Sequence, residues 1–410
     1  MANPLLSRSE EVLRYFYIAL SLPFLGIGRL KYHLSPSTPR WSSQPYKALY
    51  SVFFTLKLPF FVTATLIQYL FPSARPHPEW SLKMAFVGAY LKAGFEYQEA
   101  TRNQQAPQLT PGKVGDRFRT IQPPEPFSRI LVGPCESAAV IPKPVTGCWW
   151  PSPLRQEDAK DQKVVLYVPG GAFVLGWDID VIVKDIGATM ARHAKATKTF
   201  YVQYRLARDQ GSCFPAALQD VVTVYHHVLS LGVKPENLIL CGDSAGGSLV
   251  LAAVRYLETY QSRTGLPLPA GVMSFSPWVH VTRDAGHEWT ASSNSDKDYL
   301  PAALLQWGAE AYLPKHVSPE VAPFLSPLHR PYKSSVPILV HAGTVEGLHD
   351  QAEEFASEMA AAGSPVRFRS TKLSPHDLLL LHGYVGSTAE LDKVIADGFD
   401  LIGWDPDSPV

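Results

Sequence analysis

The chain has 410 residues, 46% of them hydrophobic, and its 37 Lys and Arg residues balance its 37 Asp and Glu residues. A chain of this length and composition can bury the core of one large α/β domain with additions, or the cores of two domains. Because it has neither a net positive charge nor a local basic stripe, we exclude nucleic acid as an expected partner.

The four cysteines show no C-x-x-C spacing, so we expect no structural zinc site. We expect buried free thiols instead. The alternative is a disulfide between Cys135 and Cys148, which would require an oxidising compartment. The cysteines are Cys135, Cys148, Cys213 and Cys241.

Two stretches near the N-terminus, residues 15–28 and 48–71, are predominantly apolar and aromatic. The first contains Pro23 and is shorter than the ~20 residues that a spanning helix needs. The second is long enough to span a bilayer, but Lys57 and Pro59 interrupt it. We expect residues 1–75 to associate with a membrane, either as an interfacial hairpin or as one imperfect span, with the endoplasmic reticulum as a candidate location. The alternative is a lid over a lipophilic pocket.

Residues 76–126 are polar and rich in proline, apart from a helical pattern over Trp80–Phe95. We therefore expect a linker that carries one lid helix. The main α/β domain is expected over residues 127–410. It should begin with antiparallel edge strands at 130–132, 138–141 and 145–150.

The pattern then alternates between buried strands and helices. Strands are expected at 164–168, 199–204, 238–241, 270–275, 336–341 and 366–371, and helices at 179–194, 216–231, 246–257, 302–312 and 351–362. Such alternation predicts a fold of the α/β class, with a mostly parallel sheet covered by helices on both faces.

A G-x-S-x-G motif lies between the strand at 238–241 and the helix that follows it, as Gly242-Asp243-Ser244-Ala245-Gly246. Small residues two before and two after the serine allow a sharp turn, which presents the hydroxyl of Ser244 above the sheet edge. The motif predicts a nucleophile elbow. Its alternative is a glycine-rich turn that only packs closely.

A nucleophilic serine needs a histidine base and an acid that orients the base. In hydrolase-type sheets both follow the serine in chain order, on loops after later strands. The loop after the penultimate strand carries Glu346 and Asp350, and the loop after the last strand carries His376. We predict Glu346 and His376 as acid and base. Asp350, which is expected to cap the next helix, and His382 are the alternatives.

The strand at 164–168 ends in Pro169-Gly170-Gly171-Ala172-Phe173. Glycines there let backbone N–H groups approach a ligand, and with the N–H of Ala245 they would form an oxyanion hole. The alternative is an ordinary turn.

Residues 163–384 resemble the hormone-sensitive-lipase-like branch of the α/β-hydrolases, which includes arylacetamide deacetylases, microbial carboxylesterases and fungal steryl acetyl hydrolases. The resemblance implies an α/β-hydrolase fold with a helical lid. It favours Glu346 over Asp350 and His376 over His382. Besides the elbow, the matching segments are 204–207, 214–220, Ser276-Pro277-Trp278, Ser326-Pro327-Leu328, 346–350 and 376–379.

The family's oxyanion loop usually reads His-Gly-Gly-Gly, whereas this chain has Pro169 and Ala172 at the flanking positions. By position, the resemblance implies Gly170 and Gly171 as oxyanion donors beside Ala245. It also implies that the lid is built from the N-terminal helices and an insertion at about 279–325.

We therefore predict a membrane-associated serine carboxylesterase or deacetylase that needs no cofactor and no metal. Its substrate would be a lipophilic ester, of a steroid-, terpenoid- or polyketide-like compound, cleaved through an acyl-enzyme intermediate. One alternative is an acyltransferase or another tailoring enzyme of secondary-metabolite biosynthesis on the same fold. A second is a non-catalytic ligand-binding receptor, against which the intact Ser244, Glu346 and His376 argue.

Overall fold

The computed structural model describes residues 38–193 and 198–404, so the apolar stretch at 15–28 lies outside the described residues. Eight strands form one sheet in the order β1-β2-β4-β3-β5-β6-β7-β8. Strand β2 pairs antiparallel with β1 and β4, and all the other neighbouring pairs are parallel. The strands are β1 (Phe118–Ile121), β2 (Val145–Trp150), β3 (Val164–Val168), β4 (Lys198–Gln203), β5 (Leu238–Asp243), β6 (Gly271–Phe275), β7 (Ile338–Gly343) and β8 (Val366–Thr371).

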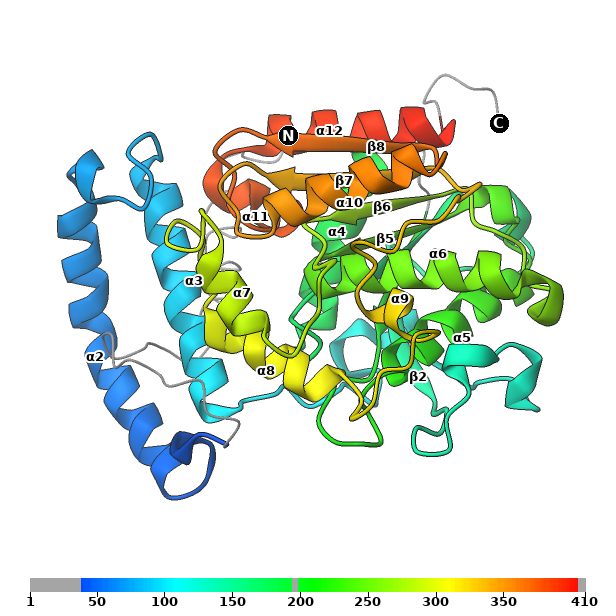
Figure 1. Cartoon of the computed structure of the whole chain (residues 1–410), viewed down its shortest axis with the longest axis horizontal. Coiled ribbons are helices and arrows are strands. Elements are labelled where there is room, and N and C mark those ends of the chain that lie inside the picture. Colours follow the sequence, from blue (N-terminus) through cyan, green and yellow to red (C-terminus); the bar gives the residue numbers. More distant parts are fainter. Residues whose placement is uncertain (1–37, 194–197, 405–410) are drawn as a thin grey trace.

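Helices cover both faces of the sheet (Figure 1). Successive side chains of a strand point to opposite faces, and the buried strand β3 accordingly supplies both halves of the core. Val164, Leu166 and Val168 pack with residues of α5, α6 and α10. Val165 and Tyr167 pack with residues of α4 and α12. These helices are α4 (Ile179–His193), α5 (Ala216–Ser230), α6 (Ser244–Thr264), α10 (His349–Ala361) and α12 (Thr388–Ile402).

The predicted fold class is confirmed, and the strands and helices expected from residue 145 onward are present. Their ends shift by a few residues, except that the helix expected at 246–257 continues to Thr264. All four cysteines are buried and free, as expected. The remaining helices are α2 (Tyr46–Tyr69), α3 (Leu82–Thr101), α7 (Ala285–Ala291), α8 (Ala302–Tyr312), α9 (Ala322–Leu325) and α11 (Leu378–Val385).

The strands expected at 130–132 and 138–141 were wrong. Residues 130–132 form a buried loop, and residues 138–141 form a loop in which only Val140 is buried. Backbone groups of both segments bond to side chains instead of to a neighbouring strand. The hydroxyl of Tyr256 donates to the carbonyl of Ile130 at 2.8 Å and accepts from the N–H of Val132 at 2.7 Å. The actual edge strand, β1, lies earlier, within the region expected to be a linker.

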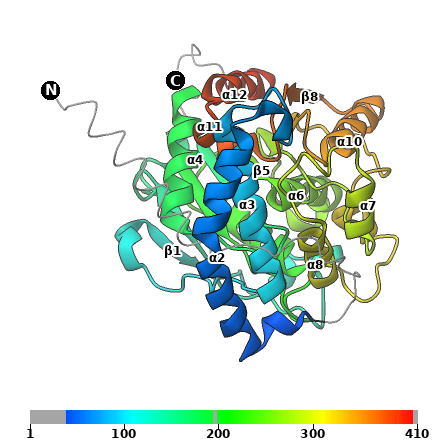
Figure 2. The same ribbon diagram turned by 90° about the vertical axis from the view of Figure 1, so that its left-hand side faces the viewer.

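The N-terminal helices α2 and α3 lie side by side against one end of the sheet, with α2 on the outside (Figures 1 and 2). Tyr50 and Phe54 of α2 pack on Ala93 and Tyr97 of α3. Just before α3, the indole N–H of Trp80 donates to the carbonyl of Leu373 at 2.8 Å. Helix α3 is therefore fixed to the loop after β8, and α2 is fixed to α3.

Candidate active site

The turn between β5 and α6 has the strand-turn-helix geometry of a nucleophile elbow. Ser244 lies at its apex with φ of 51°, in the left-handed region that a non-glycine residue rarely adopts. A Cβ on Gly242 would lie 2.5 Å from the carbonyl oxygen of Gly246, and one on Gly246 would collide with the carbonyl of Val168. Only glycine fits these two positions, and this packing stabilises the strained serine.

His376 and Glu346 meet at the same end of the sheet. Nδ1 of His376 lies 3.0 Å from Oε2 of Glu346, and both side chains are buried. The other carboxylate oxygen, Oε1, accepts the N–H of Gly343 at 3.0 Å. A buried carboxylate that accepts two hydrogen bonds in this way fixes the orientation of the imidazole and leaves Nε2 for proton transfer.

The two alternative residues occupy other places. Asp350 stands in the first turn of α10, where 77% of its side chain is exposed, and it bonds to His349. His382 is buried within α11, and burial lowers its pKa to about 4. The geometry therefore favours Glu346 and His376, as predicted.

The charges around His376 set its proton affinity. Burial lowers the pKa of His376, but the hydrogen bond and the negative charge of Glu346, with further contributions from Asp298 and Asp243, raise it above its ordinary value. The base must be neutral to accept a proton from serine, so activity is expected to fall as the pH drops through this raised pKa.

The oxyanion loop differs from the prediction at one position. The N–H of Gly170 donates to Oδ2 of Asp243 at 2.9 Å, so it is not free to bond an oxyanion. Gly170 instead allows close packing, because a Cβ there would lie 2.9 Å from the Cβ of Ser244. Its assignment as a donor is not supported by this geometry. The donor roles of Gly171 and Ala245 stay predictions.

A row of aromatic rings lies over the site. The ring of Tyr299 contacts that of His376 at a centroid distance of 6.0 Å, and Phe95 of α3 stacks on Tyr299 at 5.9 Å. Trp177 contacts Phe95 at 6.2 Å and donates its indole N–H to the carbonyl of Gly170 at 3.0 Å. The row therefore extends from the histidine to the oxyanion loop. Beside it, a pocket of about 290 Å³ is lined by Gln98 of α3, by residues 103–105 after this helix, by residues 175–178 and by residues 181–182 of α4.

The sequence profile of the α/β-hydrolase fold family matches residues 165–380, which is more than half of the chain. The chain belongs to the α/β-hydrolase fold family. The match begins within β3, so helices α2 and α3 lie outside it.

Relatives of this α/β-hydrolase support the predicted resemblance. An acetyl-hydrolase of Streptomyces hygroscopicus is 32% identical over 223 residues, which are 53% of this chain and 68% of the relative. An esterase of Acinetobacter venetianus is 28% identical over 222 residues, 53% of this chain and 69% of the relative. The crystal structure of an esterase from the bacterial hormone-sensitive lipase family has a TM-score of 0.57 and 23% identity, and covers 79% of this chain and 99% of that one. The acetyl-hydrolase and esterase relatives confirm the expected resemblance to ester hydrolases, and the solved structure shows the same fold.

Two residues next to the predicted triad, Tyr299 and Asp298, were not predicted from the sequence. The hydroxyl of Tyr299 donates to the carbonyl of His376 at 2.9 Å, and Oδ2 of the buried Asp298 accepts the N–H of Gly347 at 2.8 Å. Burial raises the pKa of Asp298 to about 6, while the charge of His376 opposes the rise and that of Glu346 adds to it. Asp298 and Gly347 are far apart in the chain, so no local pattern could pair them.

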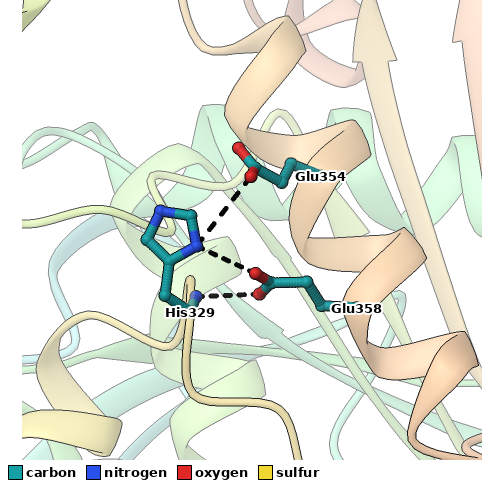
Figure 3. Close-up of side chains that lie close together, drawn as sticks. All are labelled: His329, Glu354 and Glu358. Atoms are coloured by element: carbon teal, nitrogen blue, oxygen red, sulfur yellow. Dashed lines mark hydrogen bonds and ion pairs between the residues drawn. The ribbon is translucent and has the colours of Figure 1, made fainter.

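A separate cluster of ionisable side chains joins the loop before β7 to α10 (Figure 3). Nδ1 of His329 lies 2.8 Å from Glu358 and 3.9 Å from Glu354, and the backbone N–H of His329 also donates to Glu358 at 2.8 Å. The three side chains are close enough to hold a metal ion. All three are at least partly exposed, and His329 already contacts both glutamates, so we interpret the cluster as a polar clamp between the loop and α10.

Glu346→Gln is expected to lower kcat severely, by up to ~10⁴, because an amide cannot enforce the required tautomer of His376 or stabilise its cation. Losing this anion also lowers the pKa of His376, so the acidic limb of the residual pH–rate profile should move to lower pH. Asp350→Asn is the matched control and should change kcat little. Steady-state kinetics with an aryl acetate across pH measures both effects, and the opposite ranking of the two variants would transfer the acid role to Asp350.

Proposed function

We propose that the protein is a serine carboxylesterase or deacetylase that hydrolyses a lipophilic ester at a membrane surface. The observation that carries this proposal is the buried hydrogen bond between His376 and Glu346, at the end of the sheet where the elbow presents Ser244. The acetyl-hydrolase and esterase relatives support the same reaction class.

The mechanism follows from the roles of these groups. Oγ of Ser244 attacks the ester carbonyl while Nε2 of His376 takes its proton, and Glu346 stabilises the imidazolium that forms. The backbone N–H groups of Gly171 and Ala245 bond to the oxyanion of the tetrahedral intermediate. His376 then returns the proton to the leaving alcohol, which leaves an acyl group on Ser244. Water, deprotonated by His376, cleaves this acyl-enzyme and regenerates the serine.

The aromatic row supports a lipophilic alcohol moiety, because the apolar rings of Phe95 and Tyr299 pack next to His376 and the indole of Trp177 lines the adjoining pocket. The adjoining pocket, at about 290 Å³, lies near the lower limit of ~300 Å³ for small-molecule sites. A small acyl group with a bulkier alcohol that contacts the aromatic row fits this arrangement, as in a steryl or terpenoid acetate.

Helix α2 supports attachment to a membrane. Among the described residues it is the one helix long and apolar enough to cross a bilayer. It packs on α3 near its start through Tyr50 and Phe54 and near its end through Tyr69, so it lies along the protein. Its outer face exposes large apolar side chains, and residues 38–78 contain four Lys and Arg residues but no Asp or Glu. An interfacial helix on an anionic lipid surface accounts for these features. The exposed side chains include Leu49, Val52, Phe53, Leu56, Phe60, Ile67 and Leu70.

The reaction is tested by incubating the purified protein with a steryl or terpenoid acetate and with aryl esters of short and long acyl chains. We expect mass spectrometry to detect the free alcohol and acetate. Ser244→Ala should lower kcat by at least ~10³, since the triad acts as a unit. Transfer of the acetyl group to an added alcohol, with little hydrolysis, would instead identify an acyltransferase. Binding without turnover would identify a receptor.

The membrane role is tested with a variant that lacks residues 1–71. The full chain should sediment with membranes and resist extraction by alkaline carbonate, whereas the shortened protein should be soluble. The shortened protein should still hydrolyse small water-soluble esters, because the sheet, the triad and Phe95 of α3 remain. Full-length protein found wholly in the soluble fraction without detergent would contradict membrane attachment. Loss of selectivity for lipophilic esters in the shortened protein would make α2 part of the lid.

A further inference from the structure

Two buried carboxyl groups flank the catalytic pair. Asp243 immediately precedes Ser244 and is 1% exposed, and Asp377 immediately follows His376 and is 4% exposed. Their side chains form a hydrogen bond with each other. A hydrogen bond between two carboxyl groups requires a proton, and two carboxylates this close in a buried site cannot both ionise. The pair therefore shares one proton.

The donors around each group indicate where this proton resides. Oδ1 of Asp243 accepts the hydroxyl of Tyr167, and its Oδ2 accepts the N–H of Gly170 at 2.9 Å. Asp377 receives one longer bond, from the N–H of Leu380 at 3.3 Å. Hydrogen-bond donors stabilise an ionised carboxylate, so Asp243 carries the negative charge. Asp377 is then the neutral acid that donates to it.

The pair connects loops that follow four different strands. Asp243 ends β5 at the elbow and also fixes the loop after β3 through Gly170. Asp377 lies in the loop after β8 with φ of 59°, and its backbone N–H donates to Oγ of Ser276, after β6, at 3.0 Å. The relative position of these loops determines how Ser244 and His376 face each other.

We propose that Asp377 and Asp243 form a proton-sharing bridge that positions the histidine turn against the nucleophile elbow. Both act as positioning residues, because they act through their neighbours. The catalytic effect of the bridge rests on the proposed function. The shared proton is a property of the folded protein, so it can be measured without turnover.

The surroundings of the bridge predict its response to pH. Burial raises the pKa of both carboxyl groups, and the negative charge of Asp243 raises that of Asp377 further, well above its ordinary value. Above the ordinary Asp pKa of ~3.9, the unfolded chain has released a proton that the folded protein retains. The contribution of the bridge to the free energy of unfolding therefore declines as the pH rises from this value to the higher pKa of the folded protein. The titratable groups that face the bridge are Tyr167, Tyr201, Tyr204, Cys241, Tyr299, Glu346 and His376.

The two isosteric variants should differ. In Asp377→Asn the amide N–H replaces the acid O–H as the donor to Asp243, so kcat at neutral pH should stay within about threefold of the wild type. In Asp243→Asn the side-chain amide offers one acceptor oxygen, whereas the carboxylate offers two to the surrounding hydrogen-bond donors. The NH₂ group of the amide would therefore face another donor. We expect a loss in kcat of roughly 10² or more, since small misplacements of catalytic groups cost this much. Asp377→Ala should lose more activity than Asp377→Asn, and the exposed Asp350→Asn serves as the control.

The pH profile separates a shared proton from simple packing. Wild-type kcat should decline at alkaline pH as the bridge loses its proton and two anions repel, and Asp377→Asn should remove or weaken this decline. Equal losses in Asp243→Asn and Asp377→Asn, with an unchanged alkaline limb, would overturn the bridge.

Infrared spectroscopy tests the proton directly in the wild type, whether or not the variants fold. We expect the band of a neutral carboxylic acid at neutral pH, which titrates together with the alkaline decline and is absent from Asp377→Asn. A wild-type spectrum without such a band would refute the bridge even if the enzyme is active. Conversely, the band would persist in Ser244→Ala even if Ser244 proved not to be the nucleophile.

Discussion

The turn between β5 and α6 packs directly against the loop that follows β3, and the active-site geometry depends on this contact. Gly170 and Gly246 leave no room for a Cβ, so the two backbones approach more closely than larger residues would allow. The close approach lets the N–H of Gly170 reach Asp243 and keeps Ser244 in its left-handed conformation. A parallel sheet brings the loops after β7 and β8 to the same edge, which is where an acid and a base from distant parts of the chain can meet the serine.

The N-terminal helices divide into two functional layers. Helix α3 supplies Phe95, which contacts both Tyr299 and Trp177 beside the predicted triad. Helix α2 contacts the body of the protein through α3 and leaves its other face apolar and exposed. Substrate dissolved in a lipid surface would thus meet α2 first and reach the aromatic row beside α3. We propose that the lid role belongs to α3 and the membrane role to α2, which makes the two interpretations of the N-terminus compatible.

The sequence predicted most of the sheet from β2 onward because buried parallel strands are short apolar runs separated by amphipathic helices. It also predicted the elbow and the pairing of Glu346 with His376, because the order of these residues and the strands that their loops follow can be read directly from the sequence. It failed at 130–141, where side chains of Tyr256 and Gln219 replace a strand partner. It could not predict the hydrogen bonds that Gly170 and Asp377 make to Asp243, because these contacts form only when loops from distant parts of the chain come together in the folded protein.

We propose that Ser244 carries the acyl group during turnover, with His376 as its base. Rapid quenching during hydrolysis of a lipophilic acetate, followed by peptide mass spectrometry, tests this directly. We expect an acetyl group on Ser244 in the wild type and none at that residue in His376→Ala. Turnover without any acyl group on Ser244, or with one on a different residue, would contradict it.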